Sequence, residues 1–452
     1  MNSRHNLLDG EIPGTLTRMT TPMILGMLMM FSFNLVDTFF ISMMGTEPLS
    51  AISFTFPVTF TLLSLAIGLS IGTSAVVAKH LGRGDLIKAR QASSVTSYVS
   101  MGLALLLAVL GYWFMDGIFL LLGAAPELLP QIREYMTIWL LTSTLLVGII
   151  SANSVLRASG DTRTPSFIMA GAGFINAALD PLLIFGLGPI PAMGIKGAAI
   201  ATAISWIIGF IYLFYVLAFQ HKLIDRKLPN LNIFLSSARE MLRIGIPASG
   251  ANMLTPVAAG VMTAIAASYG EATVAAFGVG SRLESIASLL VLALSTTLPP
   301  FISQNFGAGK LDRVLQSFRI AIRFVLFWQL AVYLLMVVCA NLIAGIFSSD
   351  PEVISAIRLF IWILPLGYGL QGVVILTNSA LNALHKPMHA LYLSIARFFV
   401  FYVPLAWLGS LVFGLNGFFA GAVLGNLLMA AIAWQSFNKL FSGDLKGFET
   451  SS

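Results

Sequence analysis

The sequence carries little charge. Asp, Glu, Lys and Arg make up 10% of its 452 residues, whereas about 25% is usual for a soluble domain. Hydrophobic residues make up 57%, and the mean hydropathy is +0.89. These values exclude a soluble globular protein and predict an integral membrane protein embedded in the lipid bilayer. The net charge of +6 does not indicate a nucleic-acid partner, because Lys and Arg fall in short loops rather than on one basic face.

Several chemical signatures are also missing. The one cysteine, Cys339, excludes an internal disulfide. No Gly-x-x-x-x-Gly-Lys-Ser/Thr phosphate-binding loop is present, and the five His and one Cys lack the spacing of metal ligands. Intramembrane protease motifs are absent as well. We therefore expect neither an enzyme nor a bound cofactor.

Long apolar runs dominate the rest of the chain. A membrane-spanning helix needs about 20 mostly apolar residues. Reading for such runs predicts an all-α protein with twelve spans, at 16–44, 49–77, 92–122, 127–156, 164–187, 195–219, 241–268, 272–302, 315–346, 352–382, 388–411 and 417–440.

The loops between these spans differ in charge and orient the protein. Those after even-numbered spans hold most of the positive residues: Lys79, Arg83, Lys88, Arg90, Arg157, Arg163, Lys222, Arg226, Lys227, Lys310, Arg313 and Lys386. Positive loops stay on the cytoplasmic side. We therefore expect a multi-pass protein whose two termini are both cytoplasmic. The opening residues lack the order of a cleaved signal peptide, so we expect them to form a cytoplasmic tail.

The second half of the chain repeats the first at a shift of 225 residues. Pairs at this shift are Arg18 and Arg243, Pro22 and Pro247, Gly82 and Gly307, Pro126 and Pro351, and Asn153 and Asn378. Six spans per repeat is an even number, so both halves have the same orientation. The predicted organisation is a cytoplasmic tail (1–15), an N-lobe (16–220), an inter-lobe loop (221–240), a C-lobe (241–440) and a tail (441–452).

Two carboxylates lie inside predicted spans of the N-lobe. Asp37 has Asn34 three residues before it, on nearly the same helical face, and Asp180 has Asn176 one turn before it. A charge at the bilayer centre costs at least about 2.5–3.5 kcal/mol, so such residues are usually functional. They could instead be structural hydrogen-bond partners. We favour a site that binds and releases a proton or a cation such as Na⁺, which prefers oxygen ligands.

Prolines and a third acid add secondary candidates. Pro181 directly follows Asp180, and a proline inside a helix removes a donor and kinks it. We expect hinges at Pro22 and Pro181. In the eighth span, Glu284 follows Arg282 by two residues, so the two side chains do not face each other, and a structural or gating role is favoured.

Four motifs together resemble the MATE family, multidrug and toxic compound extrusion. They are Asn-x-x-Asp-Thr at 34–38, Gly-Arg-Gly-Asp at 82–85, Leu-Arg-Ala-Ser-Gly-Asp-Thr-Arg-Thr-Pro at 156–165 and Asn-x-x-x-Asp-Pro at 176–181. The likeness covers residues 13–440 and looks strongest to the bacterial branch named for the DNA-damage-inducible protein F. In that branch the coupling acids lie in the first and fifth spans.

The resemblance implies a secondary antiporter of the bacterial inner membrane that exports small-molecule drugs and organic cations in exchange for H⁺ or Na⁺. It also implies an ion site of Asp37, Asn176 and Asp180, which could hold Na⁺, assisted by Asn153 and Thr202. A monomer is expected. The residues do not decide between H⁺ and Na⁺, because the same oxygens serve both.

Other functions remain open. Lipid-linked oligosaccharide flippases share the two-lobe plan by family resemblance. They need several intramembrane cations to hold a pyrophosphate, and few are present here. A membrane enzyme would need a nucleophile or metal cluster, and a simple channel does not explain why the pair of intramembrane aspartates is confined to one half.

Overall fold

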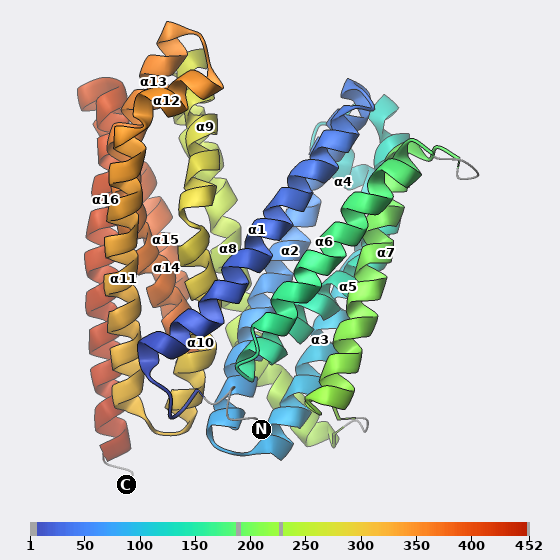
Figure 1. The fold of residues 1–452 in the computed structure, drawn as a ribbon, viewed down its shortest axis with the longest axis vertical. Coiled ribbons are helices and arrows are strands. Elements are labelled where there is room, and N and C mark those ends of the chain that lie inside the picture. The colour runs from blue at the N-terminus through green and yellow to red at the C-terminus, as the bar shows by residue number, and fades with distance from the viewer. Residues whose placement is uncertain (1–6, 187–190, 226–228, 450–452) are drawn as a thin grey trace. The chain divides into compact units, whose positions relative to one another are not determined.

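The chain is helical throughout the part that the computed structural model describes, which comprises residues 7–186, 191–225 and 229–449 (Figure 1). Within these ranges, side chains are not described for Asn34, Thr46, Glu47, Leu49 and residues 443–449. Parts of three predicted segments therefore lie outside the described residues, namely 1–15, 221–240 and 441–452.

The helices follow one another with short connections. In the first half they are α1 (Ile12–Ser42), α2 (Thr46–Gly82), α3 (Leu86–Trp113), α4 (Met115–Leu121), η2 (Pro126–Leu128), α5 (Leu129–Ala158), α6 (Arg163–Ile184), α7 (Gly194–Tyr215) and η3 (Val216–Gln220). In the second half they are α8 (Leu231–Ala267), α9 (Glu271–Ala287), α10 (Leu289–Gly307), α11 (Leu311–Val338), α12 (Ala340–Phe347), α13 (Pro351–Ile363), η4 (Leu364–Gly367), α14 (Tyr368–Ala383), α15 (Pro387–Ile395), η5 (Ala396–Tyr402) and α16 (Val403–Glu449).

Eleven stretches of the described residues are long and apolar enough to cross a membrane. One of them, Pro387–Ser442, is 56 residues long. As a single helix it would extend about 84 Å, whereas the hydrocarbon core of a bilayer is about 30 Å thick. This stretch is therefore too long for one span.

A turn at Phe413 and Gly414 divides that stretch in two. Both residues have non-helical backbone angles, and Gly414 has a φ of 59°. The backbone of Gly409 lies directly against that of Gly417, and the Lys386 Nζ donates to the carbonyl oxygen of Leu440 at 2.9 Å. The two arms are antiparallel neighbours, so the predicted spans 388–411 and 417–440 form a helical hairpin. Twelve spans result, and the predicted fold class is confirmed.

Three predicted spans of the second half are not single helices. The spans 272–302, 315–346 and 352–382 are interrupted at Ser288, at Cys339 and by η4. Pro365 lies in η4 and accounts for that break. The other two breaks have neither proline nor glycine beside them, which is why the sequence did not predict them.

The chain divides into two compact units, unit 1 (Met1–Asp9 and Thr17–Ser249) and unit 2 (Gly10–Leu16 and Gly250–Ser452). In unit 1, α5 packs against α2, α3 and α7, and in unit 2, α14 packs against α10, α11 and α16. Both α5 and α14 belong to the fourth span of their half. The predicted lobe limits remain a prediction.

The 225-residue repeat extends to backbone conformation. Gly84 and Gly309 both follow the second span of their half and have φ values of 75° and 74°. This left-handed region favours glycine, so a turn of the same kind explains the glycine at both positions. The sequence repeat therefore reflects a repeated backbone path.

Candidate functional site

The two N-lobe aspartates come together although 143 positions separate Asp37 from Asp180 in the sequence. Asp37 lies in the C-terminal part of α1, and Asp180 lies one turn before the end of α6. Their carboxyl groups are in hydrogen-bonding contact. Asp180 is fully buried and Asp37 is half-buried. The structure thus joins the two residues that the sequence singled out separately.

Asn176 links Asp180 to the next helix. Its Nδ2 donates to the Asp180 Oδ1 at 3.3 Å and to the Thr202 Oγ1 of α7 at 3.3 Å. Asn176 and Asp180 are four residues apart, so they lie on the same face of α6. The predicted group of Asp180, Asn176 and Thr202 is therefore contiguous in the structure.

The remaining residues of the predicted site have different surroundings in the structure. Asn153 is buried in α5, and its Oδ1 has no hydrogen-bond partner among the described residues. The side chain of Asn34 lies outside the described residues. Pro22 lies inside the continuous helix α1, whereas Pro181 lies in the last turn of α6, which ends at Ile184.

Tyr135 is a neighbour of the acids that the sequence did not reveal. It lies in α5, is half-buried and interacts electrostatically with both Asp37 and Asp180. Tyrosine is common near membrane interfaces, so its presence in a span gave no signal. The fourth span therefore adds a phenol to the acid pair.

The aspartate pair can accept a proton or a cation. Two carboxylates in contact repel each other when both are ionised, and one shared proton removes that repulsion. One oxygen of each acid, the Asp37 Oδ1 and the Asp180 Oδ2, is buried without a hydrogen-bond donor among the described residues. These oxygens and the nearby Thr202 hydroxyl are the ligand type that a hard cation prefers.

The described residues contain no cluster of the side chains that bind zinc. Within the described residues, no group of three or more His, Cys, Asp and Glu side chains could hold a metal ion. The acid site contains only two such residues, so Na⁺ would need the neutral oxygens of Asn176 or Thr202 as further ligands.

Of the two secondary candidates, the structure connects one. Glu284 in α9 accepts a hydrogen bond at its Oε1 from the Gln371 Nε2 of α14 at 2.8 Å. It also interacts electrostatically with Arg397 of η5. Arg282 is exposed, and no contact joins it to Glu284. The two residues are thus separate, as their spacing predicted.

The decapeptide at 156–165 forms a tight connection between α5 and α6. Asp161 is buried there and accepts hydrogen bonds from the Thr164 backbone and hydroxyl and from the His221 Nε2, the last at 3.2 Å. Burial raises the pKa of the Asp161 carboxyl, but the hydrogen bonds from His221 and Thr164 outweigh it and lower the pKa to about 2. This residue fixes the start of α6, the helix that carries Asp180.

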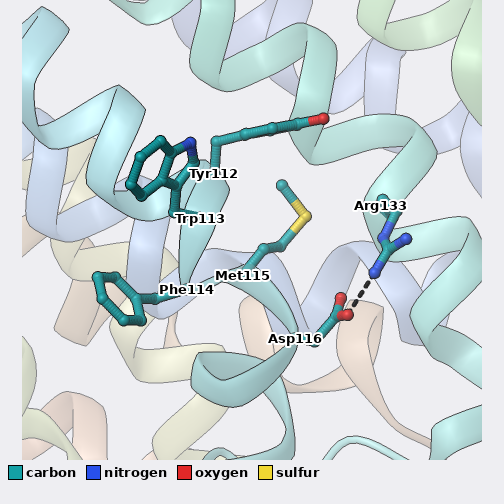
Figure 2. Close-up of a pocket in the computed structure, with 6 residues that line it drawn as sticks. All are labelled: Tyr112, Trp113, Phe114, Met115, Asp116 and Arg133. Atoms are coloured by element: carbon teal, nitrogen blue, oxygen red, sulfur yellow. Dashed lines mark hydrogen bonds and ion pairs between the residues drawn. The ribbon is translucent and has the colours of Figure 1, made fainter.

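Two pockets lie elsewhere in the N-lobe. One of about 420 Å³ is lined by Tyr112, Trp113, Phe114, Met115, Asp116 and Arg133 (Figure 2). Figure 2 shows the Arg133 guanidinium paired with the Asp116 carboxylate. A second, of about 610 Å³, shares these two residues. Neither pocket is lined by Asp37 or Asp180, and an exposed ion pair contributes at most about 1 kcal/mol.

Comparison with known proteins places the chain among transporters. The family model described as MatE matches residues 22–182 and 247–408, once in each half. A curated relative, the FAD transporter of Shewanella oneidensis, is 40% identical over 429 residues and covers 95% of both chains. The multidrug export protein MepA of Staphylococcus haemolyticus is 26% identical, over 94% of this chain and 93% of that one.

Solved structures share the fold over nearly the whole chain. The Vibrio cholerae MATE transporter VcmN in the bent form is 34% identical, with a TM-score of 0.91 and coverage of 96% of this chain and 97% of that chain. A Pyrococcus furiosus transporter of the MOP superfamily is 24% identical with a TM-score of 0.88, which shows the fold alone. The chain belongs to the MatE family and is a membrane transporter with the two-lobe fold of that family.

Proposed function

We propose that this transporter exports organic compounds in exchange for H⁺ or Na⁺ and that Asp37 and Asp180 couple the two movements. The observation that supports this most is the contact between the two carboxyl groups, one on the first span and one on the fifth. Two carboxyl groups in contact are more stable with one proton or one cation bound between them than with none. A structural pair of hydrogen-bonding groups would not need two acids.

The coupling follows because the charge repulsion between Asp37 and Asp180 differs between the ion-bound and the ion-free protein. A proton or Na⁺ between Asp37 and Asp180 removes their repulsion and lets α1 and α6 stay close. Release of the ion restores the repulsion and favours separation of these helices. Pro22 in α1 and Pro181 in α6 are the positions at which bending requires the fewest broken hydrogen bonds. Transport then alternates between the two states.

Two substrate classes have support from relatives. Relatives named multidrug export proteins favour amphipathic organic compounds, often cationic. The relative named FAD transporter is more similar, at 40% identity, and favours FAD as a second candidate. FAD is anionic through its pyrophosphate, so the two classes differ in charge.

We also propose that the protein is a monomer in the bacterial inner membrane with both termini cytoplasmic. The positive loops after even-numbered spans support this orientation. Replacing Cys339 with serine and then placing single cysteines at Ser3 and Ser451 tests it. We expect a membrane-impermeant thiol reagent to leave both cysteines unlabelled in intact cells and to label them after lysis.

The function is tested in proteoliposomes by imposing a pH gradient or a Na⁺ gradient separately. Substrates are ethidium and FAD. We expect one gradient to drive uphill export and Asp37→Asn or Asp180→Asn to reduce it at least tenfold. Asp312→Asn is the matched control, because this exposed acid lies in the first turn of α11, outside the site. Wild-type rates in both site variants would remove the coupling assignment.

A further inference from the structure

The C-lobe contains a charged cluster of its own around Glu284. The Glu284 Oε1 accepts from Gln371 at 2.8 Å, and the carboxylate interacts electrostatically with Arg397, Tyr368 and Tyr402. These residues come from α9, α14 and η5, so three segments converge on one carboxylate. The sequence repeat gave no reason to expect a site here, since the N-lobe position 225 residues before Glu284 is Thr59.

Arg397 is the positively charged residue of this cluster, and its side chain already has a hydrogen-bond partner and aromatic contacts. Its side chain is buried, its Nε donates to the Asn426 Oδ1 at 3.3 Å, and its guanidinium lies 4.7 Å from the Phe398 ring centre and 6.0 Å from that of Tyr402. Within the described residues no ion pair of 4 Å or less joins it to Glu284. Arg397 therefore offsets the cost of a partly buried carboxylate from a distance and leaves the carboxylate open to another partner.

Unfilled hydrogen-bonding capacity lies next to Glu284. The Tyr368 hydroxyl is buried without a partner among the described residues, and Tyr368 itself is 3% exposed. Glu284 is half-buried, and its second oxygen, Oε2, accepts no hydrogen bond within that part of the chain. A buried hydroxyl that lacks a partner is destabilising, and a ligand that carries a hydrogen-bonding group beside its charge would satisfy it.

A polar hydrogen bond joins the fifth and sixth spans in each lobe. In the N-lobe, the Asn176–Thr202 hydrogen bond joins the fifth and sixth spans at 3.3 Å. In the C-lobe, the Arg397–Asn426 hydrogen bond joins the fifth and sixth spans, also at 3.3 Å. Each lobe thus carries a polar bridge between the same two spans and a carboxylate beside it.

The chemistry beside Glu284 fits an organic cation. A carboxylate flanked by aromatic rings is the usual environment for ammonium and other lipophilic cations, which bind the faces of tyrosine rings. Tyr368 lies three residues before Gln371, the hydrogen-bond partner of Glu284, on the same face of α14, and the Tyr402 ring centre lies 6.0 Å from the Arg397 guanidinium. An anion would need to reach Arg397, whose side chain is 7% exposed and already hydrogen-bonded. Glu284 is the more accessible of the two charges.

We propose that Glu284, Tyr368 and Tyr402 form a C-lobe site that binds the positively charged part of an exported organic compound. This deepens the proposed export function and rests on it. The site takes cargo, whereas Asp37 and Asp180 take the coupling ion. Gln371 is a positioning residue because it donates a hydrogen bond to the carboxylate, whereas Arg397 balances the charge of Glu284 without contacting it.

Binding to purified protein in detergent tests the site without any need for coupling. The probes are tetraphenylphosphonium, a permanent lipophilic cation, and FAD. We expect Glu284→Gln to weaken tetraphenylphosphonium binding about tenfold, the factor of one contact of about 1.4 kcal/mol, and to leave FAD binding unchanged. Glu271→Gln is the matched control: it makes the same change at an exposed residue in the first turn of the same helix. Equal binding by wild type and Glu284→Gln would overturn the site.

Further experiments distinguish the proposed cargo site at Glu284 from the proposed ion site at Asp37 and Asp180. Asp37→Asn should bind tetraphenylphosphonium as the wild type does and yet fail to export it; loss of binding there would overturn the division between cargo and ion sites. A photoreactive quaternary ammonium probe on the wild-type protein should label α9 or α14, which keeps the test valid if Glu284→Gln does not fold. Labelling confined to residues 17–249, or a tenfold loss of FAD binding with cation binding intact, would overturn the cation site.

Discussion

Gly409 and Gly417 lie backbone against backbone on the two arms of the last helical hairpin. A Cβ atom on either residue would overlap the carbonyl oxygen of the other. Helices in a bilayer gain little from hydrophobic burial against each other, so close backbone approach is one of the main ways they associate. The lack of side chains at Gly409 and Gly417 therefore allows the eleventh and twelfth spans to pack closely, backbone against backbone.

Gly417→Ala should destabilise this hairpin. The added methyl group has no space, and overpacking typically costs about 1–3 kcal/mol. Thermal unfolding in detergent measures the change. Gly260→Ala is the control, since a Cβ there meets nothing within 4 Å and the residue lies in α8. An equal stability of the two variants would contradict the close contact.

Thr202→Val should slow ion-coupled export by roughly two- to tenfold. The change keeps the shape of the side chain but removes the oxygen that accepts from Asn176, a bond of about 0.5–1.5 kcal/mol. Transport rates in proteoliposomes measure it. Ser205→Ala on the same helix is the control, because the Ser205 hydroxyl bonds only to the Ala201 carbonyl oxygen of its own helix. Similar rates for both variants would argue against a role for Thr202.

Tyr135→Phe should also reduce export, by up to about tenfold, because it removes a hydroxyl beside both acids while keeping the ring. The reduction should be smaller than that of Asp37→Asn, which removes a carboxylate that we propose to bind the coupling ion. Initial rates across a range of pH values measure both. Tyr98→Phe, on the exposed face of α3, should have no effect. If Tyr135→Phe behaves like Tyr98→Phe, the phenol does not assist the pair.

Asp161 should make the stability of the transporter dependent on pH. Its pKa is about 2 in the folded protein, below the ordinary 3.8, so its stabilising effect is present in full above about pH 4 and is lost as pH falls toward 2. A shift of this size corresponds to about 2 kcal/mol. Asp161→Asn keeps the capping oxygen and removes the charge, so it isolates this contribution.

Thermal unfolding of wild type and Asp161→Asn at pH 7, 4 and 2.5 tests this dependence. We expect a difference of about 2 kcal/mol at pH 7 that narrows between pH 4 and pH 2.5. Asp85→Asn makes the same change at the start of α3; hydrogen bonds from Lys88 also lower the pKa of Asp85, but its carboxylate is exposed to solvent, so its pH dependence should be smaller than that of Asp161. A wild-type advantage that stays constant down to pH 2.5 would contradict the pKa assignment.

Some of the site could be predicted because intramembrane charge is rare. Asp37 and Asp180 are conspicuous in apolar spans, and Asn176 follows from its four-residue spacing to Asp180. Tyr135, Gln371 and Arg397 could not be found in the same way. Tyrosine and glutamine are uncharged, and Arg397 falls in the first half of the predicted span 388–411, from which a long arginine side chain can reach the membrane interface.

The sequence by itself determined the membrane class, the number of spans and the repeat, because length, hydropathy and spacing are properties of the chain alone. Only the tertiary structure decided which distant residues meet. The contact of Asp37 with Asp180 and the convergence on Glu284 depend on how helices pack within each lobe. The hairpin at Gly409 and Gly417 depends on the fit between two backbones. Such contacts join residues far apart in the chain, and no local pattern records them.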